Sequence, residues 1–270
     1  MHSGDQCNLG SVNESQFATS DHRRLSERYR YVVSLACRML DTVIDIASIP
    51  VEKVAEMCKA NRRVGLGTMG FAEYLVRMHI GYATDAGIKE AEQISHTRQT
   101  EAWKTSYALG KLKGTFPNVH LSVFNADGEQ PRNCNMTNVP PTGSTAMLVN
   151  TSSGIEPYFA MSHYASVMRK EKLYYLNSLL IDTLEKHGLA TDEIINEVSE
   201  TGTVKHIKAL PDWIKEVFVT AMDMDPDSHI KMQATFQKHC DNAISKVNEK
   251  QHKHKSNVLT DNQFSKFVYS

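Results

Sequence analysis

The sequence lacks the features that mark several large classes of protein. No apolar run approaches the roughly 18 residues of a transmembrane helix, so we expect no membrane span. The first ten residues hold no charged segment followed by an apolar stretch, so we expect no secretory signal. The formal net charge is only -1, with 30 Lys and Arg against 31 Asp and Glu. This balance excludes a nucleic-acid binder that acts through bulk positive charge.

The cysteines and histidines also lack the close spacing of metal sites. The five cysteines are Cys7, Cys37, Cys58, Cys134 and Cys240, without a Cys-x-x-Cys pair. Scattered cysteines in an odd number suit a reduced, cytoplasmic protein. The 12 histidines are equally dispersed, so we predict no metal site. Cys37, Cys58 and Cys240 fall in helical patterns and are predicted to be structural, whereas the role of Cys134 stays open.

Helical periodicity dominates the 270 residues and predicts one helix-rich α/β domain, or a piece of one. Apolar spacing predicts helices over 21–47, from Pro50 to Cys58, and over 87–112. The leucines at 173, 176, 180 and 184 form one helical stripe, and Asp225 is a good cap for a last helix that we extend to Val247. Residues 118–160 are rich in Asn, Pro, Thr, Ser and Gly, which is typical of loops and short strands.

A glycine run at 65–70 fits the pattern G-x-G-x-x-G. A lone match is a weak signal for a dinucleotide site. The run lies between helical patterns without a clear strand before it, and no acidic residue stands in place for a ribose. We therefore reject a dinucleotide site and expect close packing of a helix against neighbouring backbone.

A run of small residues, Thr142-Gly143-Ser144-Thr145-Ala146, follows two prolines. Such a run can present consecutive backbone N–H groups and hydroxyls to a phosphate, above all where a helix begins. It contains no lysine, so it is not a Walker A loop. Taken alone, the run is more readily a proline-rich turn than an anion site.

Cys7 is the cysteine that best fits a redox role. It lies between Gln6 and Asn8 in a segment of Asn, Gly and Ser, outside any apolar stripe. A lone cysteine is more often a small core residue, so the residues by themselves favour the redox role only modestly.

Six segments, in order along the chain, together resemble the large catalytic subunit of ribonucleotide reductase, and most closely its adenosylcobalamin-dependent (class II) branch. They are His2–Asn13, Asn61–Gly70, Arg132-Asn133, Pro141–Thr145, Ser152–Pro157 and His229–Lys246. The resemblance covers residues 1 to about 248 and leaves 249–270 as a divergent polar tail. It implies the C-terminal part of a ten-stranded α/β barrel.

The resemblance also implies a reaction. Ribonucleotides are converted to deoxyribonucleotides by a cysteine thiyl radical, which adenosylcobalamin generates in class II enzymes, and a second pair of cysteines supplies the electrons. Cys7 matches one member of that redox pair. Thr142, Gly143, Ser144 and Thr145 match the loop that holds the substrate phosphates, and Ala146 stands where the family often has serine. The implied partners are a ribonucleotide and a thioredoxin-like dithiol.

The segment that carries the radical cysteine lies upstream of Cys7 in the family and is not part of this sequence. We therefore expect an N-terminal reductase fragment as a partner, with activity only in the completed enzyme. Two alternatives stay open. One is an inactive remnant, and the other is a stand-alone protein that binds nucleotide phosphates through Thr142 to Thr145.

Overall fold

The computed structural model describes residues 4–19, 22–126, 128–167 and 171–246. The strands are β1 (Asn8–Asn13), β2 (Val64–Met69), β3 (Ser162–Val167) and β4 (Glu171–Leu176). The α-helices are α1 (His22–Ile46), α2 (Glu52–Asn61), α3 (Phe71–Arg77), α4 (Asp85–Lys113), α5 (Gly143–Leu148), α6 (Ser178–Lys186), α7 (Asp192–Thr201), α8 (Asp212–Val217) and α9 (Pro226–Gln237). Short 3-10 helices cover Glu14–Phe17, Pro117–Leu121, Val123–Asn125 and Ala221–Asp223.

A parallel sheet lies at the centre of the arrangement. β1 pairs with β2 in parallel register, from Asn8 opposite Val64 to Asn13 opposite Met69. Isolated parallel bridges extend this pair, first from Leu66 to Thr137 and then from Val139 to Ile244. In the described ranges these four segments form an open arc, so the sheet is a part of a barrel that is not closed.

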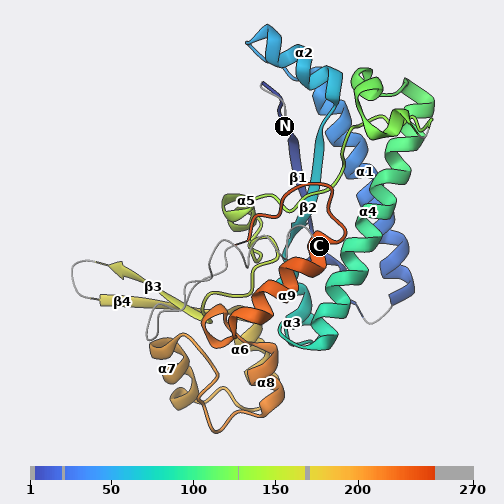
Figure 1. The fold of residues 1–270 in the computed structure, drawn as a ribbon. Helices are drawn as coiled ribbons and strands as arrows, with labels where there is room; N and C mark the ends of the chain where they lie inside the picture. The colour runs from blue at the N-terminus through green and yellow to red at the C-terminus, as the bar shows by residue number, and fades with distance from the viewer. Residues whose placement is uncertain (1–3, 20–21, 127, 168–170, 247–270) are drawn as a thin grey trace.

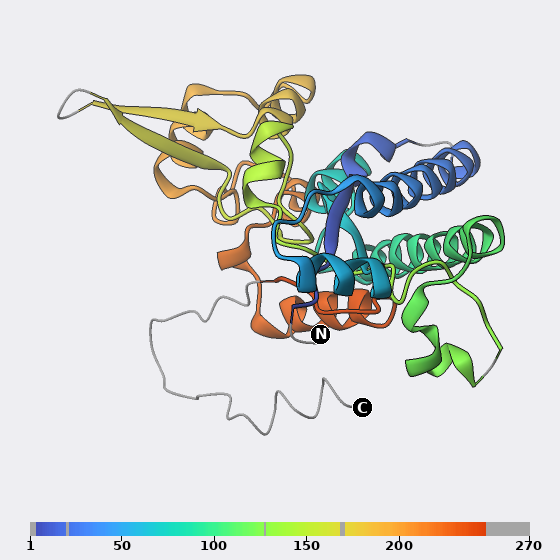
Figure 2. The same ribbon diagram turned by 90° about the horizontal axis from the view of Figure 1, so that it is seen from above.

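Helices cover one face of this sheet. α1 and α4 pack together on the same side, and their apolar residues form a buried core with Val12, Val64 and Leu66 of the strands. α5 lies on the opposite side of the sheet, as the two views agree (Figures 1 and 2). The sheet therefore has a face closed by helices and a second face toward α5.

A second apolar core is built from the C-terminal helices. Leu180 and Leu184 of α6, Val198 of α7 and Ile214 of α8 are buried together. The antiparallel β3–β4 hairpin projects from this region (Figure 1).

Several predictions from the sequence are confirmed. The helix expected over 21–47 is α1, and the helix expected over 87–112 is α4. The Asp225 carboxylate caps α9 by accepting a hydrogen bond from the Ser228 backbone N–H at 2.9 Å. α2 begins two residues after Pro50 and runs past Cys58 to Asn61.

Two helix predictions were wrong. Residues 171–176, which carry two of the four striped leucines, form strand β4 of a hairpin, and the helix begins only at Ser178 after the Asn177 cap. The last helix ends at Gln237 rather than reaching Val247, which lies outside the described residues, as do 249–270. After Gln237 the chain instead joins the parallel arc at Ile244, and Cys240 and Ile244 pack partly buried against the core.

The glycine run was also assigned wrongly, because it forms the fully buried strand β2 rather than a helix contact. A Cβ on Gly65 would lie 2.7 Å from the Asn138 amide oxygen, and a Cβ on Gly67 would lie 2.2 Å from the Pro140 ring. Glycine is needed here because the next extended segment packs its side chains over the strand.

A buried ionic cluster joins three distant segments at Asp41. One Asp41 oxygen accepts hydrogen bonds from the Arg62 guanidinium at 2.7 and 2.9 Å and from the Asn133 amide at 3.0 Å. Arg132 approaches the other oxygen at 3.5 Å. Arg62 has left-handed backbone geometry (φ 49°) at the end of α2, and it also binds the half-exposed Asp45 at 2.6 Å.

We predict that Asp41→Ala lowers the free energy of unfolding by about 3–5 kcal/mol, because it leaves the Arg62 guanidinium buried without its main partner. Asp45→Ala is the matched control, since Asp45 binds the same guanidinium at the surface, and its cost should be about 0–1 kcal/mol. Urea unfolding of the two variants measures both values. Equal costs would contradict the assignment of Asp41 as the central partner.

A second buried network surrounds Glu14. Its carboxylate accepts hydrogen bonds from the Tyr29 hydroxyl at 2.9 Å and the Thr68 hydroxyl at 2.6 Å. Arg98, which is fully buried, donates to the Thr68 hydroxyl and lies 3.8 Å from Glu14. Burial raises the pKa of Glu14 to about 7, although Arg98 and the two hydroxyls oppose this effect.

This raised pKa gives the stability a defined pH dependence. The folded chain binds a proton at Glu14 that the unfolded chain releases near pH 4.5, so this contribution is present at low pH and is lost as pH rises through about 7. The free energy of unfolding of Glu14→Gln, taken relative to that of the wild type, should therefore rise by roughly 2–3 kcal/mol from pH 5 to pH 8. Denaturant unfolding at both pH values tests this, with the exposed Glu197→Gln as control. A constant difference between wild type and Glu14→Gln would refute the prediction.

Candidate functional site

Cys7 lies directly before β1, on the face of the sheet away from α1. The Asn8 backbone N–H bonds to the Arg63 carbonyl at 3.0 Å, which fixes the start of β1 against β2. The Asn8 side chain donates to the Leu40 carbonyl of α1, and a Cβ on Gly10 would contact the Leu40 side chain. Since side chains alternate along a strand, Cys7 is directed to the opposite face, the one that α5 occupies.

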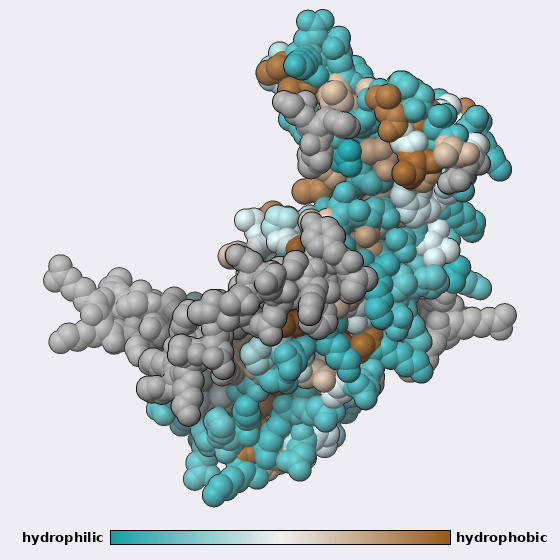
Figure 3. Space-filling model, in the orientation of Figure 1, coloured by the Kyte–Doolittle hydropathy of each residue, from teal (hydrophilic) through white to brown (hydrophobic). Residues whose placement is uncertain are grey.

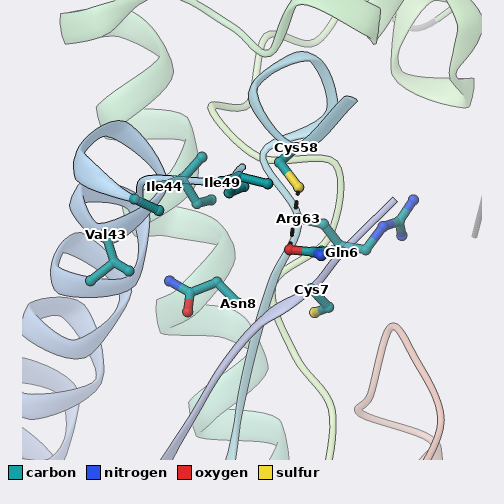
Figure 4. Close-up of a pocket in the computed structure, with 9 residues that line it drawn as sticks. Gln6, Cys7, Asn8, Val43, Ile44, Ile49, Cys58 and Arg63 are labelled. Atoms are coloured by element: carbon teal, nitrogen blue, oxygen red, sulfur yellow. Dashed lines mark hydrogen bonds between the residues drawn. The ribbon is translucent and has the colours of Figure 1, made fainter. Parts of the chain in front are cut away.

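A pocket of about 160 Å³ adjoins Cys7 (Figure 4). Its lining consists of Gln6, Cys7, Asn8, Val43, Ile44, Ala47, Ile49, Cys58 and Arg63. The Cys58 thiol donates to the Gln6 amide oxygen at 3.8 Å, whereas the Cys7 sulfur points away from Cys58. The two thiols therefore have different surroundings, and Cys58 stays a buried residue of α2, as predicted.

Charged and polar groups surround the Cys7 thiol. The Arg63 guanidinium binds Asp5 at 2.8 Å and the Asn135 amide oxygen at 2.8 Å. Burial raises the pKa of Cys7, while the hydrogen bond with Asn135 and the charge of Arg63 lower it. The charge of Asp5 raises that pKa further. The net pKa is above the ordinary value, so thiolate formation at Cys7 depends on these neighbours.

Cys134, whose role the sequence left open, lies in the same cluster. Its thiol donates to the Asn135 amide oxygen at 3.1 Å. Burial raises its pKa to about 11, which keeps it a thiol at neutral pH. All five cysteines are free.

The predicted phosphate run begins a helix, as the anion-site hypothesis requires. α5 starts at Gly143, with Thr142 as its cap residue. The Thr142 hydroxyl is buried and accepts a hydrogen bond from the Gly154 backbone N–H at 2.7 Å. The Thr142 hydroxyl therefore fastens the run to the 153–154 turn and is not directed to solvent.

The next three residues have a different environment. Gly143, Ser144 and Thr145 are exposed, and Ala146 is buried. The first N–H groups of a helix have no partner within the helix, so this exposed turn presents donors and two hydroxyls to solvent. The structure thus separates the five predicted residues into an anchor, three accessible residues and one packed residue.

The segment that follows α5 is tied to the end of β2 and to the start of α3. The Gly70 N–H donates to the Ser152 carbonyl at 2.7 Å, and the Thr151 hydroxyl donates to Glu73 at 2.6 Å. Cys7 precedes the parallel strands and α5 follows them, so the two predicted elements lie on one face but at different strand ends.

Three residues of the Cys7 cluster, Asp5, Arg63 and Asn135, were missed as site residues by the sequence reasoning. Asp5 and Arg63 stand within segments that carry the resemblance, which was the available signal. Among the residues that the structure describes, no group of three or more His, Cys, Asp or Glu side chains is arranged for a metal ion. No helix in the same ranges is long and apolar enough to cross a membrane.

Comparison with known proteins gives a consistent result. The family model for the ribonucleotide reductase barrel domain matches residues 2–129 and 125–261. A vitamin B12-dependent ribonucleoside-diphosphate reductase of Thermoplasma acidophilum is 35% identical over 90% of this chain and 32% of its own length. A reductase of the same description from Mycobacterium tuberculosis is 33% identical over 90% of this chain and 35% of its own. The chain thus spans about a third of the length of these relatives.

A solved structure supports the fold. The class Id ribonucleotide reductase alpha subunit of Actinobacillus ureae matches with a TM-score of 0.70 and 26% identity, over 87% of this chain and 42% of that one.

We predict that Thr142→Val releases the Gly154 amide while Thr142→Ser retains it, because only the serine keeps the accepting oxygen. Loss of this buried bond costs about 1–2 kcal/mol, which corresponds to roughly tenfold faster amide exchange. Hydrogen exchange at Gly154 measures the effect. Equal protection in the valine and serine variants would show that the hydroxyl is not the anchor.

Proposed function

Because the chain belongs to the ribonucleotide reductase barrel-domain family, we propose that it forms part of a catalytic subunit that converts ribonucleotides to deoxyribonucleotides by radical chemistry. One observation carries the proposal. Cys7 and the accessible turn at 143–145 face the same side of the parallel sheet, away from the covering helices α1 and α4. In this proposal that face is the interior of the completed barrel.

In the proposed reaction, Cys7 contributes one of two reducing thiols. The ribose 2′-hydroxyl leaves as water and hydrogen takes its place, which requires two electrons and two protons. A pair of cysteine thiols supplies both and becomes a disulfide. A thioredoxin-like dithiol then reduces this disulfide by exchange, for which a thiolate is the attacking group.

The turn at the start of α5 would bind the substrate phosphates. The N–H groups at 143–145 and the hydroxyls of Ser144 and Thr145 are suitable donors to phosphate oxygens. Thr142 would hold the turn in place through Gly154, while Ala146 packs inward and its N–H donates to the Thr142 carbonyl within the helix. Binding here would orient the ribose, which is a positioning role.

The open sheet supports an N-terminal reductase fragment as partner, carrying the radical cysteine and the second redox cysteine. In the described ranges β1 pairs only with β2, so its other edge has unpaired backbone groups. Apolar residues also gather over α2 and the 117–125 segment, where Val51, Leu121 and Val123 are exposed (Figure 3). Such surfaces are typical of an interaction face.

Adenosylcobalamin is proposed as the cofactor because two of the relatives are described as vitamin B12-dependent. The pocket beside Cys7 does not fit this group. Its volume of about 160 Å³ is below the roughly 300–1,000 Å³ of ordinary small-molecule pockets, and a corrin is larger still. The residues of this pocket therefore do not form the cofactor's site, and we derive no step through it.

We expect two classes of variant to separate in the reductase completed with the N-terminal fragment, adenosylcobalamin, a dithiol and ribonucleotide. Cys7→Ser should abolish turnover while leaving nucleotide affinity nearly unchanged. Ser144→Ala with Thr145→Val should weaken binding by about tenfold or more for each lost hydrogen bond, since bonds to charged groups contribute about 1.5–3 kcal/mol. Chromatography of deoxyribonucleotide and equilibrium nucleotide binding are the two measurements.

Thr201→Val on α7 is the control for lost hydroxyls, because Thr201 is exposed and lies in the C-terminal helical region. It should change neither quantity. If Cys7→Ser loses binding and turnover equally, Cys7 is structural. If the double variant binds nucleotide as the wild type does, the phosphate assignment is wrong.

A further inference from the structure

Arg63 lies between two thiols in the parallel sheet. Asn8 pairs with Val64, and Leu66 pairs with Thr137 in the next segment. The register of β1 and β2 continues to Cys7 opposite Arg63. In the next segment the Arg63 guanidinium bonds to the side chain of Asn135, the residue after Cys134. The arginine is therefore the residue that neighbours both sulfur-bearing positions.

The guanidinium of Arg63 is held in place from both sides. Its Nε donates to Asp5 at 2.8 Å, and Nη1 donates to the Asn135 amide oxygen at 2.8 Å. The Asp5 side chain is fully buried, and the Asn135 amide is fixed in turn by donating to the Val64 carbonyl at 2.6 Å. A planar fork with two fixed partners loses little further freedom, so its charge has a defined position.

We propose that Arg63 is a positioning residue, and that its fixed positive charge stabilises the Cys7 thiolate. Cys134 stays a thiol and orients the Asn135 amide. This inference rests on the proposed redox role of Cys7 and extends it to the group that controls the thiol. Figure 4 shows the Arg63 side chain on the side of β1 away from Val43 and Ile44, clear of the apolar pocket wall.

The electrostatic surroundings of Cys7 support this assignment. Burial is the largest influence and raises the pKa of Cys7, and the Asn135 hydrogen bond and the Arg63 charge oppose it. The negative charge of Asp5, on the same segment as Cys7, raises this pKa. From α2, Cys58 faces Gln6 rather than Cys7.

The same arginine acts on both thiols. Cys134 also experiences the Arg63 charge, but its burial raises its pKa to about 11. At neutral pH it donates its S–H to the Asn135 oxygen that also accepts from Arg63. The Arg63 charge thus lowers the pKa of both thiols against the effect of burial, and Cys134 stays protonated at neutral pH.

The test is alkylation of the full chain by iodoacetamide over a range of pH, with each cysteine followed by peptide mass spectrometry. Arg63→Gln should move the Cys7 rate profile to higher pH, and a profile displaced by about one pH unit gives a roughly tenfold lower rate at neutral pH. Arg63→Lys keeps a charge but only one arm of the fork, so its profile should lie between those of Arg63→Gln and the wild type. Arg77→Gln, which removes an exposed arginine paired with Glu73, is the control and should leave the profile unchanged.

Two results would overturn the proposal. An unchanged Cys7 profile in Arg63→Gln would mean that the charge does not act on the thiol. Faster alkylation of Cys7, Cys58 and Cys134 together at every pH would mean that Arg63 only holds the fold. If Arg63→Gln does not fold, Arg63→Lys decides the question by the same displacement of the profile.

The assay needs no substrate, cofactor or partner chain. The expected displacement without reductase activity would therefore refute only the proposed function. An unchanged profile in a chain that supports turnover would refute only the role of Arg63.

Discussion

The buried carboxylate of Asp41 is the constraint on which the candidate site depends. It lies on α1, and through Arg62 and Asn133 it joins the start of β2 to the start of the neighbouring extended segment. Arg62 reaches it from a left-handed backbone conformation, which ends α2 and turns the chain into the strand. Arg62 then binds α1 while Arg63 binds Asp5 and Asn135, so one turn serves both the core and the surroundings of Cys7.

In the candidate site, the residues that fix the local backbone are different from the residues that are exposed to a ligand. Thr142 and Asn135 each have buried hydrogen bonds to backbone, whereas Ser144 and Thr145 are exposed beside the open face of the sheet. Groups held by a rigid scaffold can bind a ligand without further ordering, which lowers the entropic cost of binding. The open arc of parallel segments leaves this face without its second half, which agrees with a chain that spans about a third of its relatives.

Local sequence patterns predicted the elements whose structure depends on residues close together in the sequence. The long helices α1 and α4 follow from apolar periodicity, and the Asp225 cap follows from its position before a proline. The leucines at 173 and 176 were wrongly assigned to a helix, because two leucines three residues apart are too short a pattern to distinguish a helix from a strand. The residues after Gln237 were misassigned because pairing with a segment about 100 positions away decides their structure.

The site was predictable only in part. Resemblance identified Cys7 and the 142–146 run, and α5 does begin where an anion site would need a helix. The inward direction of the Thr142 hydroxyl depends on the 153–154 turn, which no local pattern encodes. Asp41 offered one overlooked signal, since it falls on the buried stripe of its helix between Cys37 and Ile44.

The most direct test of the central claim is the fate of Cys7 in one turnover. The completed reductase, with cofactor and ribonucleotide but no external dithiol, is quenched and its cysteines are mapped by mass spectrometry. The account predicts a disulfide between Cys7 and a cysteine of the N-terminal fragment, formed in equal amount to the deoxyribonucleotide. Product formed while Cys7 remains a free thiol would contradict the account.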